Sequence, residues 1–69
     1  MTDPVFRKLE IVGTSTVSIE DAIARGVAAT ATAGETVDWF EVLETRGAVR
    51  EGKVHQYQVV LKVGVRVRA

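Results

Sequence analysis

Trp39 is the only tryptophan in this 69-residue chain, and it is the first candidate for a ligand-binding residue. It lies in the segment VDWFEV, residues 37–42, whose apolar residues do not alternate as they would in a strand with one buried face. An indole offers an offset-stacking surface to a planar conjugated ring. Gln58 carries both a donor and an acceptor, which suits a pyrimidine-like ring edge, and Arg46 or Arg66 suits a phosphate. Such a binding site needs no acid–base or metal chemistry.

The composition excludes several other kinds of site. The chain has no cysteine and a single histidine, so disulfides, Cys-based zinc sites and multi-His sites are excluded. Nine basic and nine acidic residues cancel, which gives no general electrostatic case for nucleic acid or an anionic membrane. No apolar run approaches the roughly 20 residues that span a bilayer, and no signal-peptide pattern is present. We therefore expect a cytoplasmic protein without a metal, a nucleic-acid partner or a membrane partner.

The hydrophobic periodicity predicts one α+β domain, residues 1–69, of order β-α-β-β, with residues 1–4 flexible. The expected elements are strands over 5–12, 37–49 and 54–67 and a helix over 18–33. The REGK segment, residues 50–53, predicts a short hairpin connection. Because the last strand exceeds the usual length of 3–10 residues, we expect it to curve or to project beyond the monomer.

Particular residues are expected to shape the helix and its ends. Ser18 is the predicted N-cap, with Thr16 as a competing candidate, and Gly34 is the predicted C′ residue. Gly26 is predicted to let the helix approach the sheet closely, and Gly13 to take a positive φ in a turn.

A single amphipathic helix covers only one face of such a sheet. We expect Phe40 and Val42 to meet the helix, and the opposite face to carry Val37, Trp39, Glu41 and Leu43. An exposed tryptophan needs either another subunit or a ligand to cover it, and both interpretations stay open at this point. A chain of this size buries only about 60% of its unfolded surface, so oligomerisation is the expected source of extra stability.

Five segments carry a resemblance to a known family. EIVGTS (10–15), DWFEV (38–42), RG (46–47), YQV (57–59) and KVGVR (62–66) occur in the order seen in dodecins, small flavin-binding proteins. The resemblance covers about residues 5–67. It implies a three-stranded antiparallel sheet wrapped around one helix, assembled as a hollow homododecamer. It also implies a non-enzymatic protein that binds FMN, with riboflavin or FAD as possible ligands, and that stores the flavin and quenches its excited state.

The resemblance also assigns roles to individual residues. Trp39 matches the tryptophan that stacks on a pair of flavins together with its symmetry-related copy. Gln58 matches the glutamine that hydrogen-bonds the isoalloxazine edge. Arg46 and Arg66 match basic residues near the ligand phosphate or its entrance, and Arg7 matches a basic position on the first strand.

Two further points follow from the resemblance. Asp38 and Glu41 flank the tryptophan and are secondary candidates for the site. Some relatives also bind coenzyme A through basic residues late in the helix and just after it. Here the corresponding stretch reads AATATAGET, residues 28–36, without Lys or Arg, which puts a coenzyme A site in doubt.

Two alternatives to flavin binding belong to other functional classes. A purely structural homo-oligomer without flavin would use Trp39 as an interface residue only. A small oligomeric tautomerase-like enzyme would need an N-terminal proline, whereas Pro4 follows Met-Thr-Asp in this chain.

Overall fold

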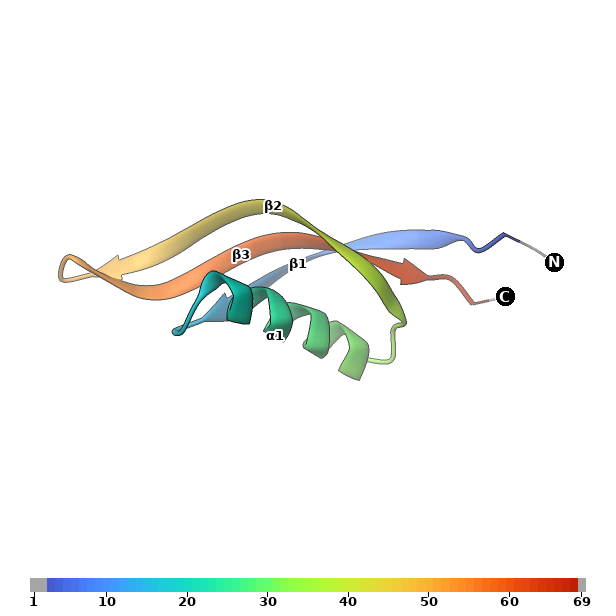
Figure 1. Cartoon of the computed structure of the whole chain (residues 1–69), viewed down its shortest axis with the longest axis horizontal. Coiled ribbons are helices and arrows are strands. Elements are labelled where there is room, and N and C mark those ends of the chain that lie inside the picture. Colours follow the sequence, from blue (N-terminus) through green and yellow to red (C-terminus); the bar gives the residue numbers. More distant parts are fainter. Residues whose placement is uncertain (1–2, 69) are drawn as a thin grey trace.

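The computed structural model describes residues 3–68 and has four elements in the order strand, helix, strand, strand (Figure 1). They are β1 (Phe6–Ser15), α1 (Ile19–Thr32), β2 (Val37–Arg50) and β3 (Lys53–Arg66). The strands form one antiparallel sheet of order β1-β3-β2, which confirms the predicted α+β topology. The predicted flexibility of residues 1–4 lies partly outside the described residues, which begin at residue 3.

The molecule is markedly elongated. Its extents are 56 × 20 × 13 Å and its radius of gyration is 14.2 Å, against about 11 Å for a compact domain of this length. Strands β2 and β3, of 14 residues each, arch along the molecule, and their hairpin continues well past the helix (Figure 1). This confirms the predicted projection of the long strand.

The fully buried core consists of four side chains of the central strand and one of the helix. They are Val59, Leu61, Val63, Val65 and Ala22. The four β3 residues alternate along the strand, as the sequence pattern predicted, and all face α1. Leu9 and Ile11 of β1 lie against this core as partly buried neighbours.

The turn at the hairpin tip has a two-residue loop. Arg50 pairs with Lys53, and the two residues between them, Glu51 and Gly52, have φ values of 53° and 75°. Two consecutive positive φ values define the type I′ geometry that matches the twist of the flanking strands. Among residues 3–68, Glu51 is the only non-glycine residue with a positive φ.

Replacing Glu51 by asparagine is therefore expected to stabilise the hairpin. Asparagine visits the left-handed region at lower cost than glutamate, and we expect a gain of about 0.5–1 kcal/mol. Urea unfolding at a fixed protomer concentration measures it. The matched control is Glu51→Ala, which keeps the backbone penalty and should give no gain; equal shifts in the two variants would contradict the prediction.

The strand that precedes the helix is longer than predicted, and the expected turn at Gly13 is wrong. Gly13 is a buried residue of β1, and a Cβ atom on it would lie 2.1 Å from the carbonyl oxygen of Ala22. On the helix side of this contact, a Cβ on Gly26 would lie 3.6 Å from the Cα of Gly13. The predicted close approach at Gly26 is thus confirmed, and Gly13 is required for space rather than for backbone conformation.

Hydrogen bonds join the end of β1 to the start of α1. The Ser15 hydroxyl donates to Asp21 Oδ2 at 2.6 Å and accepts from the Val17 amide at 2.9 Å. Ser18 is the N-cap, as predicted, and its Oγ accepts from the Asp21 amide. At the other end, the φ of 100° at Gly34 agrees with its predicted C′ role.

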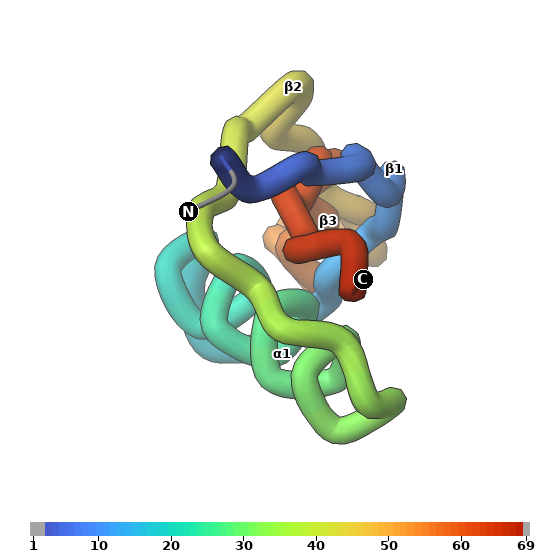
Figure 2. Tube along the Cα trace, turned by 90° about the vertical axis from the view of Figure 1, so that its right-hand side faces the viewer, coloured from blue at the N-terminus to red at the C-terminus, as the bar shows by residue number. Residues whose placement is uncertain are grey.

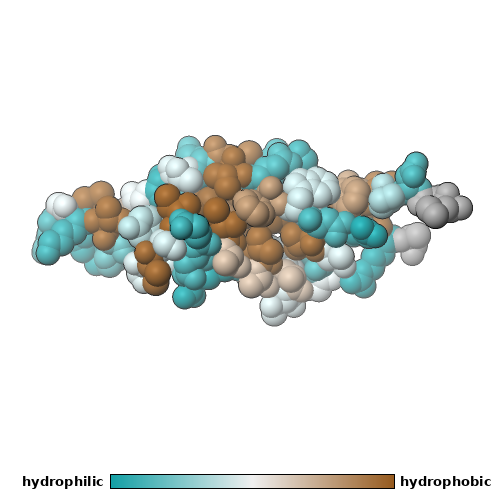
Figure 3. Space-filling model, in the orientation of Figure 1, coloured by the Kyte–Doolittle hydropathy of each residue, from teal (hydrophilic) through white to brown (hydrophobic). Residues whose placement is uncertain are grey.

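The helix lies mainly against β1 and β3 and contacts β2 least. Figure 2 shows α1 below β1 and β3 in the end-on view. Phe40 pairs with Val63 and Val42 with Leu61, so both point to the helix side of the sheet. They nevertheless stay 49% and 43% exposed. The predicted face is therefore confirmed, but the helix of the same chain covers these two side chains only in part. Apolar residues remain visible across the middle of the molecule in Figure 3.

Candidate functional site

Trp39 lies on the sheet face opposite the helix because β2 contains a bulge just before it. Val37 pairs with Val65, whereas Trp39 pairs with its neighbour Gly64, so Asp38 is the extra residue. The bulge puts Val37 on the helix face against the core. The prediction that Val37 shares the face of Trp39 is therefore wrong, while the predicted placement of Trp39 is correct. A local bulge explains the lack of alternation in this segment.

The Trp39 ring is held over the backbone of Gly64. A Cβ atom on Gly64 would lie 2.3–2.5 Å from three neighbouring ring atoms, Cε2, Cζ2 and Cδ2. Three nearly equal distances indicate that one ring face lies on the glycine. The Phe6 ring lies beside the indole, with centroids 4.9 Å apart and planes at 70°. Trp39 as a whole is half-buried, so part of its surface stays accessible.

The indole nitrogen has a charged partner. Trp39 Nε1 donates to Glu41 Oε2 at 3.0 Å, and Lys8 Nζ lies 2.8 Å from the same oxygen. The hydrogen bonds from Lys8 and from the indole lower the pKa of the Glu41 carboxyl below its ordinary value. Glu41 is therefore ionised well below neutral pH.

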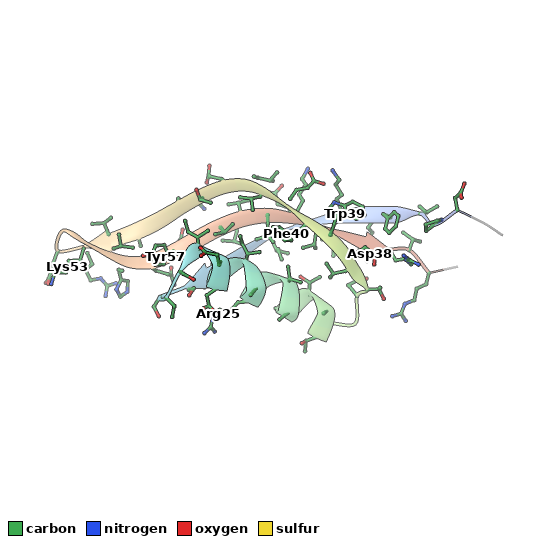
Figure 4. All side chains as sticks on the ribbon, viewed as in Figure 1. Arg25, Asp38, Trp39, Phe40, Lys53 and Tyr57 are labelled. Carbon is green, nitrogen blue, oxygen red and sulfur yellow. The ribbon has the colours of Figure 1, made fainter. Side chains whose placement is uncertain are left out.

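Arg66 lies at the same end of the sheet as Trp39. Its Nη2 and Nε donate to Asp38 Oδ2 at 2.8 and 3.2 Å, and its guanidinium carbon lies 5.6 Å from the centroid of the Phe6 ring. Figure 4 shows Trp39 and Asp38 near one end of the sheet, far from Lys53 at the hairpin tip. Arg66 is thus oriented by the residue beside Trp39 and by its aromatic neighbour.

Gln58 and Arg46 form a second group on the same face. They are cross-strand partners, and the Gln58 amide nitrogen donates to Gln56 Oε1 at 2.9 Å. Gly64, which pairs with Trp39, is six residues further along β3, and a strand rises about 3.3 Å per residue. The two groups are therefore about 20 Å apart within one chain. At this backbone separation, the Gln58 amide lies well outside hydrogen-bond distance of the indole of the same chain.

Arg7 lies on the opposite face from Trp39. Its partner in the sheet is Val65, and its guanidinium forms an ion pair with Glu35 after the helix. Arg7 and Arg66 nevertheless line one open hollow of about 380 Å³ at the end of the sheet, together with Glu35 and Arg68. Two of the predicted basic residues are therefore close neighbours, and Arg46 is not among them.

Two residues of this site were missed by the sequence reasoning, Phe6 and Lys8. Phe6, Lys8 and Glu10 are spaced by two, which places all three on one face of β1, opposite Leu9 and Ile11. Phe6 was the signal in the sequence that could have identified this part of the site, because an aromatic side chain on a polar strand face needs a partner to cover it. Here the partner is Trp39.

Two other kinds of function gain no support from the arrangement of side chains. Among residues 3–68, no group of three or more acidic or histidine side chains is placed to hold a metal ion. No helix in this part of the chain has the length and apolar character needed to cross a membrane.

Comparison with known proteins gives consistent matches along the chain. The family model described as Dodecin matches residues 5–68. A curated Dodecin from Thermus thermophilus is 46% identical over 63 residues, which covers 91% of this chain and 91% of the relative. The solved structure of dodecin from Streptomyces davaonensis has a TM-score of 0.93 at 35% identity and covers 99% of this chain and 100% of its own. A tryptophan-to-phenylalanine mutant of the T. thermophilus dodecin has a TM-score of 0.90 at 42% identity, over 97% of this chain and 100% of its own.

Proposed function

The chain belongs to the dodecin family, and on this premise we propose that it is a flavin-binding protein that stores flavin and quenches its excited state. FMN is the proposed ligand, with riboflavin and FAD as further candidates. The proposed assembly is a hollow homododecamer with stacked flavin pairs between symmetry-related copies of Trp39. We propose a binding role rather than an enzymatic one.

The observation that carries this proposal is the Trp39 ring. One face lies on Gly64, and the half-buried ring keeps its other face for a ligand. A planar, conjugated isoalloxazine matches such a surface in offset stacking. A bound flavin would supply a light-absorbing ring whose excited state an adjacent electron-rich indole can quench.

The separation of the two polar groups supports a site between chains. An isoalloxazine stacked on Trp39 would take its edge hydrogen bond from Gln58 of another copy, because the Gln58 of the same chain is about 20 Å away. A two-fold interface presents every residue twice, so one contact creates two equivalent half-sites. Within one chain, Arg66 is the basic residue best placed near the ring for a phosphate, and Arg46 would come with the second copy.

The exposed apolar surface supports self-association. The accessible surface is 4960 Å², whereas a compact monomer of this mass exposes about 4,250 Å². Phe40, Val42 and Leu43 are 43–49% exposed in one stretch of β2. A second copy of the chain that covers this stretch would remove the apolar area from water.

Coenzyme A is not included in the proposed ligands. The last turn of α1 contains no basic residue, and the prediction that a coenzyme A site is in doubt stands.

Titration of FMN with the protein tests the proposal. Flavin fluorescence is expected to fall to a small fraction of its initial intensity as the indole stacks on the isoalloxazine ring. Light scattering on the same sample should give the mass of a dodecamer. A dodecamer that leaves FMN fluorescence unchanged at micromolar protein would support the purely structural oligomer instead.

A further inference from the structure

Glu41 is the only acidic side chain that contacts the indole within the described residues, and the proposed flavin contacts do not use it. Its carboxylate accepts the Trp39 Nε1 hydrogen at 3.0 Å from a position two residues along β2. Two residues apart on a strand is the spacing that puts both side chains on one face. The contact therefore joins two side chains of the same strand face.

The remaining contacts of the indole are apolar. Gly64 lies under the ring and Phe6 lies beside it, so both restrict the plane of the ring without a directional bond to its nitrogen edge. The last torsion of an aromatic side chain has broad minima, and apolar contacts alone leave this torsion less sharply defined. The hydrogen bond to Glu41 is directional and selects the one orientation in which the nitrogen edge points along β2.

Glu41 is itself held by neighbouring charges. Lys8 of β1 lies 2.8 Å from the oxygen that accepts the indole hydrogen. Lys62 of β3 is the cross-strand partner of Glu41, and on its other side it pairs with Glu10. The charged neighbours of the Glu41 carboxylate are thus two cations, Lys8 and Lys62, with Glu10 one strand further away. The Lys8 hydrogen bond, the indole hydrogen bond and the nearby Lys62 charge all lower the pKa of Glu41.

We propose that Glu41, clamped by Lys8, is a positioning residue that holds the Trp39 ring in the orientation in which its free face stacks on a ligand. The geometry of the ring in the free protein is independent of any ligand. Only the consequence for stacking rests on the proposed flavin binding.

The first test uses the free protein, in which Trp39 is the sole tryptophan. Near-ultraviolet circular dichroism of the indole reports how well its orientation is held. We expect Glu41→Ala to lose more than about half of this signal, because a charge-assisted hydrogen bond is lost. Glu41→Gln should retain most of it through its amide oxygen. The matched control is Glu44→Ala, on the same strand and face but paired with Arg46, and it should change nothing.

The pH dependence separates positioning from a general structural effect. The bond needs the carboxylate, so the indole signal is expected to persist at neutral pH and to fall with a midpoint below 4.5, the ordinary value for glutamate. Lys8→Met removes the main cause of the lowered pKa and should raise the midpoint. Glu41→Gln should show no such transition. A transition that persists unchanged in Glu41→Gln, or an unchanged signal in Glu41→Ala, would overturn the proposal.

The second test adds FMN. Glu41→Ala is expected to bind FMN about tenfold more weakly than the unmodified protein. The control for affinity is Glu20→Ala, which removes an exposed carboxylate on α1 and should leave FMN binding unchanged. If Glu41→Ala loses the circular dichroism signal of the indole but keeps full FMN affinity, the orientation of the ring does not determine how well it stacks on FMN. That result would overturn this part of the proposal. If the unmodified protein does not bind FMN, the proposed function fails, and the signal of the free protein still decides whether Glu41 positions the ring. Should Glu41→Ala not fold, Glu41→Gln and Lys8→Met carry the same test through the pH midpoint.

Discussion

Replacing Trp39 by alanine is expected to abolish the quenching of FMN fluorescence while the protein stays assembled. The substitution removes the stacking face that lies over Gly64. An aromatic side chain buries about 150–250 Å² in such a contact, and its loss costs about 3 kcal/mol or more, which is over a hundredfold in Kd. Fluorescence titration of FMN, with light scattering for the assembly, measures both quantities.

The matched control for Trp39→Ala keeps an aromatic ring at this position. Trp39→Phe keeps a smaller ring and should retain weakened binding. Quenching of normal strength in Trp39→Ala would show that the ring is not the platform. A Trp39→Ala protein that dissociates would show that Trp39 mainly holds subunits together. That result would support the structural alternative, in which another subunit rather than a ligand covers the ring.

Replacing Gly13 by alanine is expected to be the most destabilising single-methyl change in the chain. The new Cβ would lie 2.1 Å from the carbonyl oxygen and 3.0 Å from the carbonyl carbon of Ala22, which are backbone atoms of α1. The helix must move away from β1, and the core contact of Ala22 is lost with it. We expect a loss of about 2–4 kcal/mol in the free energy of unfolding.

Urea unfolding at matched protomer concentration measures this effect, since assembly makes stability depend on concentration. Thr14→Ala is the matched control, because Thr14 is the next residue on β1 and is exposed. Its effect should stay within about 0.5 kcal/mol. A Gly13→Ala protein as stable as the control would show that the helix is not held against the strand at this glycine.

The order and type of the elements could be predicted because they depend on local spacing. The alternation along 54–67 and the four-residue spacing in the helix identify their buried faces without knowledge of their neighbours. Capping by Ser18 and the hairpin at 50–53 likewise depend on residues that are close in sequence. Errors arose where a second element decides the role of a residue. Nothing near Gly13 in the sequence tells that Ala22 will lie against it.

The candidate site divides in the same way. Trp39 could be identified from its type and its place in the strand, and its face was predicted correctly. The bulge that moves Val37 to the other face was not predictable, because an extra residue is visible only against its partner strand. Glu41 contacts the ring from two residues along the same strand, β2. Phe6 and Lys8 come from β1, far away in the sequence, so only the tertiary structure brings them to Trp39 and Glu41.

The amino-acid sequence by itself therefore established the four elements, the family resemblance and the exposure of one tryptophan on the uncovered face. The tertiary structure alone decided how much of Phe40 and Val42 stays exposed, because the helix lies mainly over β1 and β3 and covers β2 only in part. It also decided that Trp39 and Gln58 lie about 20 Å apart, because the register of β2 and β3 sets their separation. The long, arched pair of strands β2 and β3 thus separates the two groups of side chains, which the proposed site would combine from two copies of the chain.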